Sequence, residues 1–565
     1  MTNHKFGSYG GGSKRRPRIV ALVLVVVLIG AGFLGYRQYI RMVTKSANSL
    51  LAAQVYAEAE KKFNRASRLP LSGGTGKDGL GALALLRGDR EEAKAHFAEV
   101  LARKPGGFGA NPALVFTMLL EQGKYRAARD YMTFLENWKK SSQLDRFHHF
   151  FAATFLGLRD LDQTQAYLDK VDPEHREAET YQKVSATLEQ YKRNGEVPII
   201  LDRHGKTLFR ETLATGERSF VSPALFSGWM NEGKLAWSGH IEEGELNVLH
   251  TTLDLNLQRS AYQAMQGYAG TLVLVDPSSG EILSAFGTEG QPPFNTSFEP
   301  GSVIKILTYA AFLSEGLDTS LFAPLDYPGN DEIGGKIFYD WTTHGKLATV
   351  NEGMAVSCNL MFARMGIELG WSRLQREMSA YLSGPTSANL LLEASNGTLL
   401  GEPDGAWELG RAAIGLDFPS ATALGLVRIP ATIANGGRLV EPWILNQVTN
   451  HQGAAIQSHE PNPGQERFSA PVAAELSAGM SMAVTSGKGT ARRAEVPFAS
   501  AAMKTGTAGD RPFDSIMIGF FPQEQPQVAF AFFLNQGGKC EIHGARVAKR
   551  LLEQIKALAP EYLGR

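Results

Sequence analysis

Residues 271–286 read TLVLVDPSSGEILSAF, two apolar runs on either side of a Pro-Ser-Ser-Gly turn. This pattern predicts two buried β-strands joined by a tight turn. Residues 197–209 repeat the pattern less clearly, and apolar runs at 515–521 and 527–534 predict further strands. Strands therefore lie at both ends of a region that begins near residue 196.

The rest of this region has the spacing of helices. Apolar residues recur at helical intervals in 302–315, 350–369, 471–484 and 543–558. Strands at both ends with helices between them predict an α+β domain, built on an antiparallel sheet flanked by helices.

The composition excludes several classes of function. The chain has 565 residues, enough for two to four domains at roughly 100–200 residues each. Its 57 Lys and Arg balance 57 Asp and Glu, whereas a nucleic-acid-binding face needs surplus positive charge. Two cysteines, Cys358 and Cys540, cannot form a disulfide scaffold or a four-thiolate zinc site, and no His-Glu-x-x-His is present. We therefore predict no metal centre.

Residues 19–36 form an uncharged, mostly apolar stretch of 18 residues. As a helix it would measure about 27 Å, close to the thickness of a bilayer core. Four basic residues precede it, which favours an N-terminus in the cytoplasm: Lys14, Arg15, Arg16 and Arg18. The alternative is a cleaved signal peptide, but the stretch is long for one and no clear Ala-x-Ala follows. We predict a cytoplasmic basic tail over 1–18, a single transmembrane helix over 19–36, and a periplasmic remainder.

A degenerate repeat occupies the next part of the chain, residues 46–195. Residues 86–97 have a counterpart at 121–132 and a fainter one at 158–168, at steps of 35 and 36 positions. The period and the small-then-aromatic spacing resemble tetratricopeptide helical hairpins, which stack and leave a groove for partners. The alternative is an irregular helical spacer. In both cases residues 46–66 are predicted to form one continuous helix.

Ser302 and Lys305 lie at the start of a predicted helix, in the sequence Glu-Pro-Gly-Ser-Val-Ile-Lys. Residues three apart share a helix face, so a lysine amine would lie one turn from a serine hydroxyl. A serine is a poor nucleophile until a base takes its proton, and a buried neutral lysine can act as that base. Ser-x-x-Lys alone is weak evidence.

Two further motifs follow Ser302 along the chain. Ser357-Cys358-Asn359 lies inside the helix predicted over 350–369, and Lys504-Thr-Gly-Thr507 precedes a predicted strand. A strand edge with lysine and threonine side chains beside an exposed N–H suits a substrate carboxylate and a developing oxyanion.

In this order, Ser-x-x-Lys, Ser-x-Asn and Lys-Thr-Gly resemble the motifs of the penicillin-binding protein transpeptidases, the penicilloyl-serine transferase family. Surrounding phrases add to the resemblance, at 252–258, 275–283, 434–437 and 487–491. The resemblance covers residues 196–565. It implies a linker with short strands over 196–250 and a transpeptidase/β-lactamase-like domain over 251–565.

The resemblance implies four catalytic residues. Ser302 would attack the carbonyl between the two terminal D-alanines of a peptidoglycan stem peptide, and Lys305 would accept its proton. Ser357 would relay a proton to the leaving amine, and Asn359 would hold the peptide amide. An amine from a neighbouring strand would then resolve the acyl-enzyme, whereas a β-lactam would stall there. No diffusible cofactor is implied.

The resemblance also implies a substrate-binding strand. Lys504, Thr505 and Thr507 would bind the terminal carboxylate, and Gly506 would allow another chain to approach the backbone. The backbone N–H groups of Ser302 and Thr507 would form the oxyanion hole.

Other functions share part of this pattern. No Glu-Asp-x-x-Phe, a stretch found in peptidoglycan glycosyltransferase domains, precedes residue 196. The resemblance therefore implies a monofunctional, class B-like transpeptidase, with a separate glycosyltransferase or other cell-wall partner that binds residues 46–195. A D,D-carboxypeptidase or β-lactamase would deacylate with water. Glu-x-x-Leu-Asn, the motif with the water-activating glutamate of class A β-lactamases, does not occur between Asn359 and Lys504. A β-lactam sensor or scaffold acting through the repeats is the third alternative.

Cys358 departs from the Ser-Asp-Asn triplet of class A β-lactamases. Beside Lys305 its thiol could have a lowered pKa and oxidise, or it could be a packed small apolar residue. A disulfide between Cys358 and Cys540 is the remaining alternative.

Overall fold

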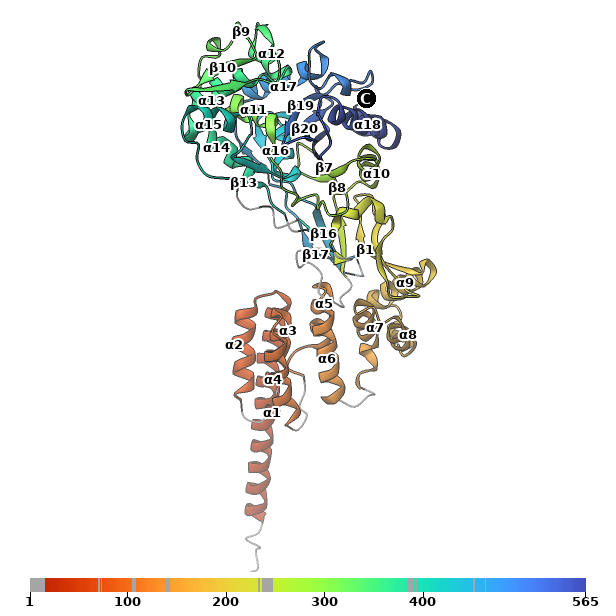
Figure 1. Cartoon of the computed structure of the whole chain (residues 1–565). Coiled ribbons are helices and arrows are strands. Elements are labelled where there is room, and N and C mark those ends of the chain that lie inside the picture. Colours follow the sequence, from red (N-terminus) through yellow and green to blue (C-terminus); the bar gives the residue numbers. More distant parts are fainter. Residues whose placement is uncertain are drawn as a thin grey trace, which may run out of the picture. The chain divides into compact units, whose positions relative to one another are not determined.

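The computed structural model describes residues 16–69, 72, 74–103, 108–138, 143–231, 234–235, 247–383, 386, 390–392, 394–450, 453–462 and 464–564, without the side chains of 16–23 and 230–235. The chain divides into two compact units (Figure 1). The first is Met1–Gln190 with 244–246 and 450–454, and the second is the remainder.

The first unit is helical. Its helices in the described residues are α1 (Arg16–Ala52), α2 (Tyr56–Ser67), α3 (Lys77–Arg87), α4 (Arg90–Leu101), α5 (Pro112–Glu121), α6 (Tyr125–Trp138), α7 (His148–Gly157), α8 (Leu161–Asp169) and most of α9 (Glu179–Asn194), whose last residues belong to the second unit, with short 3-10 turns η2 (Asp145–Phe147) and η3 (Pro173–His175).

Three helix pairs in this unit are closed by the same kind of turn. Gly88, Gly123 and Arg159 separate α3 from α4, α5 from α6 and α7 from α8, and their φ angles are 93°, 66° and 62°. The next residue donates its N–H to a carbonyl five positions back: Asp89 to Ala84, Lys124 to Leu119, and Asp160 to Phe155. This left-handed turn ends the first helix of each pair. The turns recur at the spacing of the sequence repeat, and the tetratricopeptide assignment stays a prediction.

The continuous helix predicted over 46–66 is wrong. α1 ends at Ala52 and α2 begins at Tyr56, because Gln54 adopts a left-handed conformation with φ 57°. Val55 donates its N–H to the carbonyl of Leu50, which closes the end of α1. The turn lets α2 pack against α1 instead of extending it.

α1 includes the stretch predicted to cross a membrane, residues 19–36. Within the part of the chain that the structure describes, no helix has an apolar segment long enough for a bilayer. Side chains at the start of the predicted span, up to residue 23, lie outside the described residues.

The second unit is built on a five-stranded sheet with every neighbouring pair antiparallel. Its order is β19 (Ala502–Ala508), β20 (Asp514–Phe521), β21 (Val528–Asn535), β7 (Ala269–Val275) and β8 (Ile282–Gly287). β7 pairs with β21, so strands from both ends of this region lie side by side. The predicted α+β fold on an antiparallel sheet is confirmed.

Both faces of this sheet are buried. Alternate residues of each strand point to opposite sides, so each face packs through its own set of side chains. One face packs with α16 (Ala423–Ala434), through side chains such as Val273, Ile518 and Ala531. The other packs with α10 (Leu255–Ala264) and α18 (His543–Leu558), through side chains such as Leu272, Met517 and Phe532. The apolar runs of the sequence therefore mark strands covered on both sides (Figure 1).

A second sheet and several short elements complete this unit. The second sheet has the order β17 (Ala455–Ser458), β16 (Leu445–Asn450), β6 (Asn247–Thr251), β1 (Glu196–Leu201), β2 (Thr207–Thr212) and β3 (Arg218–Phe220). The two-stranded pairs are β4 (Met230–Asn231) with β5 (Lys234–Leu235), β9 (Leu325–Tyr327) with β12 (Gly345–Leu347), β10 (Asn330–Ile333) with β11 (Lys336–Tyr339), β13 (Gly397–Leu399) with β14 (Pro419–Ala421), and β15 (Arg438–Leu439) with β18 (Gln465–Glu466). The remaining helices are α11 (Lys305–Ser314), α12 (Val350–Ala355), α13 (Asn359–Leu369), α14 (Trp371–Leu382), α15 (Ala406–Ala413) and α17 (Ala470–Thr485), with 3-10 turns η4 (Pro223–Trp229), η5 (Gly301–Ile304), η6 (Thr319–Leu321), η7 (Arg492–Ala494) and η8 (Pro560–Leu563).

Two of the four predicted helices differ in detail. The helix predicted over 302–315 begins with η5, so Ser302 lies in a 3-10 turn and Lys305 starts α11. The helix predicted over 350–369 is broken between α12 and α13, because Ser357 adopts a left-handed conformation with φ 57°. The helices predicted over 471–484 and 543–558 are confirmed as α17 and α18.

η5 lies directly against β19, and two glycines allow this contact. A Cβ on Gly506 would lie 2.8 Å from the Pro300 carbonyl oxygen and 3.2 Å from Val303. A Cβ on Gly301 would lie 2.9 Å from the Thr507 carbonyl oxygen, and the φ of Gly301 is +58°. A side chain at either glycine would push the turn away from the strand.

We expect Gly506→Ala to destabilise the second unit by about 1–3 kcal/mol, since the added methyl group must displace a backbone carbonyl. Hydrogen exchange of the peptide that contains β19, measured on the full chain, would report this loss as faster exchange. Gly487→Ala is the matched control, because its Cβ would have no heavy atom within 4 Å. Equal exchange in both variants would contradict the packing argument.

Candidate active site

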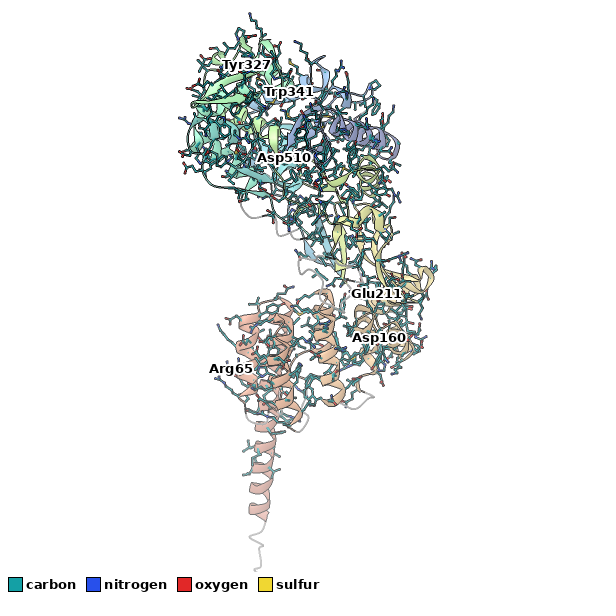
Figure 2. The ribbon with its side chains drawn as sticks, viewed as in Figure 1. Arg65, Asp160, Glu211, Tyr327, Trp341 and Asp510 are labelled. Carbon is teal, nitrogen blue, oxygen red and sulfur yellow. The ribbon has the colours of Figure 1, made fainter. Side chains whose placement is uncertain are left out.

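η5, the break between α12 and α13, and β19 enclose a cavity of about 330 Å³. Its wall includes residues from all three sequence motifs and from the β19–β20 turn. The lining residues are Ser302, Trp341, Ser357, Asn359, Ile414, Leu416, Thr490, Thr505, Gly506, Thr507, Arg511, Phe513, Lys539 and Glu541. Trp341 is labelled in Figure 2.

The Ser302 hydroxyl faces this cavity from η5. Among the described residues it has no hydrogen-bond partner, so its oxygen is available to a bound molecule. One turn later, Lys305 is completely buried. Lys305 Nζ donates to the Ser357 carbonyl oxygen at 2.7 Å, to Ser357 Oγ at 3.2 Å and to Asn359 Oδ1 at 2.6 Å.

Ser357 Oγ accepts hydrogen bonds from two lysines. Lys504 Nζ lies 2.8 Å from it, opposite Lys305, and also donates to the Thr505 carbonyl oxygen at 2.8 Å. Because both acceptor positions of the hydroxyl are used, its own proton is free to be donated elsewhere. The left-handed backbone of Ser357 costs of order 1–3 kcal/mol, which is typical of residues held in place at functional sites.

Burial shifts the pKa of both lysines downwards. The pKa of Lys305 falls to about 8, because desolvation of the ammonium group outweighs the negative charge of Asp340. Desolvation, and then the positive charge of Lys305, hold the pKa of Lys504 well below its usual range. A buried amine with such a pKa can accept a proton near neutral pH.

Of the substrate-binding residues expected from sequence, Thr505, Gly506 and Thr507 line the cavity, and the two threonine hydroxyls have different partners. Thr505 Oγ1 donates to Thr490 Oγ1 at 2.8 Å. Thr507 Oγ1 accepts from the backbone N–H of Cys540 at 3.2 Å, which leaves the Thr507 proton available. Lys504 is completely buried. All eight candidate residues therefore belong to one site, with Lys305 and Lys504 just behind the cavity wall.

Asp340 is a residue of the site that sequence reasoning missed. Its Oδ2 accepts from the N–H groups of Asn359 and Leu360 at 2.8 and 3.1 Å, so it caps the start of α13 from another segment. Burial alone would raise the pKa of Asp340, but His344, Lys305 and these N–H groups outweigh it and lower the pKa to about 2. No local motif marks this residue, because its partners are distant in sequence.

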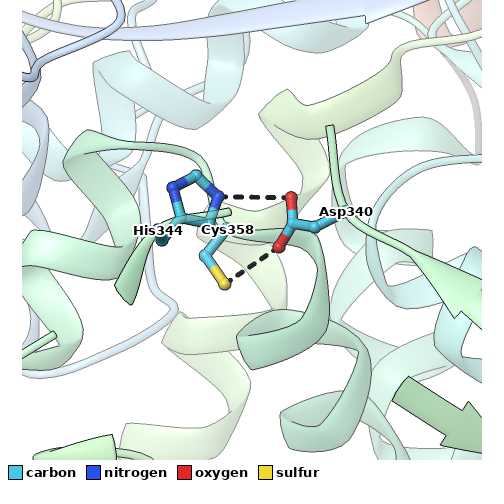
Figure 3. Close-up of side chains that lie close together, drawn as sticks. All are labelled: Asp340, His344 and Cys358. Carbon is cyan, nitrogen blue, oxygen red and sulfur yellow. Dashed lines mark hydrogen bonds and ion pairs between the residues drawn. The ribbon is translucent and has the colours of Figure 1, made fainter. Parts of the chain in front are cut away.

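Asp340, His344 and Cys358 form a compact cluster, shown in Figure 3. His344 Nε2 lies 3.3 Å from Asp340 Oδ1, and Cys358 Sγ donates to Asp340 Oδ2 at 3.1 Å. One ligand atom from each residue lies within 4.8 Å of the others, so the three could hold a metal ion. The spacing of these residues in the sequence matches no His-Glu-x-x-His or paired-cysteine motif, and the absence of a metal centre stays a prediction.

The structure decides the alternatives for the two cysteines. Cys358 and Cys540 are separate, buried thiols, so the disulfide alternative is wrong. Burial and the negative charge of Asp340 raise the pKa of Cys358, the opposite of a reactive thiolate. Cys358 is the packed residue at the start of α13, where its sulfur accepts from the Met361 N–H.

Known proteins share this domain. The family model of the penicillin-binding protein transpeptidase domain matches residues 270–556. The peptidoglycan D,D-transpeptidase PbpA of Mycolicibacterium smegmatis is 26% identical over 334 residues, 51% of this chain and 67% of that protein. The peptidoglycan D,D-transpeptidase MrdA of Escherichia coli K12 is 25% identical over 374 residues, 54% of this chain and 57% of that protein.

Solved structures share the fold. The D,D-transpeptidase domain of a peptidoglycan glycosyltransferase from Eggerthella lenta superposes with a TM-score of 0.58 at 23% identity, over 65% of this chain and 99% of that one. Penicillin-binding protein A of Mycobacterium tuberculosis superposes with a TM-score of 0.56 at 21% identity, over 64% of this chain and 99% of that one. Because the family model matches half of the chain, including every candidate residue, the chain belongs to the penicillin-binding protein transpeptidase family.

Proposed function

We propose that the chain is a serine-type D,D-transpeptidase. It crosslinks peptidoglycan stem peptides through an acyl-serine intermediate and is inhibited by β-lactams. The observation that carries the proposal is the pair of buried lysines on Ser357 Oγ, beside the unpartnered hydroxyl of Ser302. Relatives named peptidoglycan D,D-transpeptidases support it, as do acyl-enzyme complexes of the M. tuberculosis protein with ceftriaxone and penicillin G.

In the acylation step, neutral Lys305 takes the proton of Ser302 as the serine oxygen attacks the peptide carbonyl. The backbone N–H groups of Ser302 and Thr507 stabilise the negative oxygen of the tetrahedral intermediate. The proton passes from Lys305 through Ser357 to the leaving D-alanine amine. The hydrogen bond between Lys305 Nζ and Ser357 Oγ, 3.2 Å long, supports this route.

In the second step, an amine of a neighbouring stem peptide attacks the acyl-serine. Ser357 and Lys305 remove the proton from this amine, and Ser302 leaves as the restored hydroxyl. Asn359 holds the peptide amide of the donor, and the strand Lys504-Thr505-Gly506-Thr507 binds its carboxyl end before the D-alanine leaves. Water in place of the amine would make the chain a D,D-carboxypeptidase or β-lactamase.

Ser302→Ala should abolish covalent labelling by a fluorescent penicillin, because no oxygen remains to form the acyl-enzyme. It should also abolish dimeric muropeptides when the wild-type chain forms them from lipid-linked polymer. Ser297→Ala is the matched control, since Ser297 is exposed and its hydroxyl contacts Ser420 outside the cavity. Labelling that survives in Ser302→Ala would reject the nucleophile.

The same incubation separates the competing functions. Release of D-alanine by the wild-type chain without dimeric muropeptides would favour the carboxypeptidase. Labelling with neither product would favour a sensor or scaffold.

Acylation by benzylpenicillin should slow as the pH falls below about 8. The folded-state pKa of Lys305 lies near 8, so the neutral base is present above this pH and is lost below it, about tenfold per pH unit. Stopped-flow acylation rates measured between about pH 6 and pH 9.5 would show this decrease. Ser297→Ala should keep the same profile. A rate independent of pH across this range would contradict Lys305 as the base.

We also propose that residues 19–36 anchor the chain in the cytoplasmic membrane, with 1–18 in the cytoplasm and the catalytic domain in the periplasm. The uncharged sequence of 19–36 and the basic residues before it support this. Membrane fractionation should find the full chain in the pellet and a chain lacking 1–36 in the soluble fraction. The same distribution for both chains would contradict the anchor.

We propose further that 46–195 form a tetratricopeptide-like module, 196–250 a linker and 251–565 the transpeptidase domain. A monofunctional transpeptidase needs glycan strands made elsewhere, so a separate glycosyltransferase or other cell-wall protein is the expected partner of the module. Three helix pairs closed by equivalent turns support a repeat that stacks and binds partners. Affinity capture with the full chain, compared with a chain lacking 46–195, tests this assignment.

A further inference from the structure

We propose that Arg511 is a substrate-specificity residue that binds the terminal carboxylate of the donor peptide at the mouth of the cavity. The inference rests on the proposed function and adds a residue that lies outside the three sequence motifs. Arg511 lies in the turn between β19 and β20, four positions after Thr507, and lines the same cavity as Ser302.

Lys504 cannot easily supply the charge that a carboxylate needs. Its side chain is completely buried, and Nζ donates to Ser357 Oγ and to the Thr505 carbonyl oxygen. These bonds use two of its three N–H donors, and its complete burial keeps the ammonium group behind the cavity wall. Lys504 Nζ therefore contacts Ser357 directly, and its charge acts on a carboxylate in the cavity only through space.

The two threonines supply one free donor between them. The Thr505 proton is given to Thr490 Oγ1, whereas Thr507 Oγ1 accepts from the Cys540 N–H and keeps its proton free. One neutral hydroxyl orients a carboxylate but does not balance its charge. A cation beside Thr507 would add Coulombic attraction and further charge-assisted hydrogen bonds to the same carboxylate.

Two exposed cations line the cavity, Arg511 and Lys539. Lys539 Nζ lies 4.0 Å from Glu541, whose carboxylate also lines the cavity and offsets this charge. The Arg511 guanidinium lies 5.7 Å from the centre of the Phe513 ring. Among the described residues Arg511 has no carboxylate partner, so its charge is available to a ligand.

The chemistry of arginine suits this position. The planar guanidinium presents parallel N–H donors that match both oxygens of a carboxylate, and it can remain on an aromatic face meanwhile. The Phe513 ring, which also lines the cavity, would limit the side chain to orientations near the wall. A donor peptide that runs along β19 would then end beside Thr507 and Arg511.

The test compares two probes that differ only in this carboxylate, benzylpenicillin and its methyl ester. Second-order acylation rates are measured by stopped flow on the full chain. Arg511→Gln should lower the rate with benzylpenicillin roughly 10- to 100-fold and leave the rate with the ester unchanged. Arg511→Lys keeps the charge but loses the paired N–H donors of the guanidinium, so its rate with benzylpenicillin should lie between those of wild type and Arg511→Gln.

Lys539→Gln is the matched control, a second exposed cation of the same cavity, and it should keep the wild-type preference for the acid. An unchanged preference in Arg511→Gln would overturn the inference, and so would an equal loss with both probes or the same loss in Lys539→Gln. Failure of the proposed function looks different, because wild type itself would then not be acylated by benzylpenicillin.

Discussion

The active site depends on one hydroxyl oxygen, Ser357 Oγ, held between two buried lysines. Lys305 approaches it from the start of α11 and Lys504 from β19, at 3.2 and 2.8 Å. The oxygen therefore joins the two walls that Gly301 and Gly506 bring into contact. Two buried ammonium groups around one neutral oxygen repel each other and lack water, so the site favours loss of a proton. The arrangement that closes the cavity thus also lowers the pKa of both lysines.

Such a site is costly to fold, and its surroundings offset part of the cost. Ser357 is held in a left-handed conformation that most residues avoid. Asp340 carries a buried negative charge on the N-terminus of α13, where the helix dipole and two N–H groups stabilise it. This charge partly restores the pKa of Lys305, which desolvation alone would lower further. The basicity of Lys305 is therefore set by the balance between burial and one carboxylate.

The motifs predicted which residues meet but not how the backbone brings them together. The order of Ser302, Ser357 and Lys504 was visible because each triplet is local, and the strands were visible because both faces of the sheet are buried. The break at Ser357 was not, because the residues around it have an uninterrupted helical pattern. Asp340 was missed for a different reason, since its role arises only from contacts across the fold. The left-handed turns of the first unit were predicted only in part. The sequence showed the spacing of the repeat, but it did not show that each copy is closed by a left-handed turn.

The buried lysines and the exposed arginine of the site suit different roles, because burial changes the charge of a lysine. A lysine that exchanges protons must be desolvated, since only then does its pKa approach neutral pH, and desolvation removes it from direct contact with a charged substrate. A cation that recognises a carboxylate must keep its charge, and arginine does so because its pKa is far above neutral. Lys305 and Lys504 are completely buried, whereas Arg511 is exposed and lines the cavity. The proposed roles therefore give proton transfer to a buried lysine and charge recognition to Arg511, in the turn after β19.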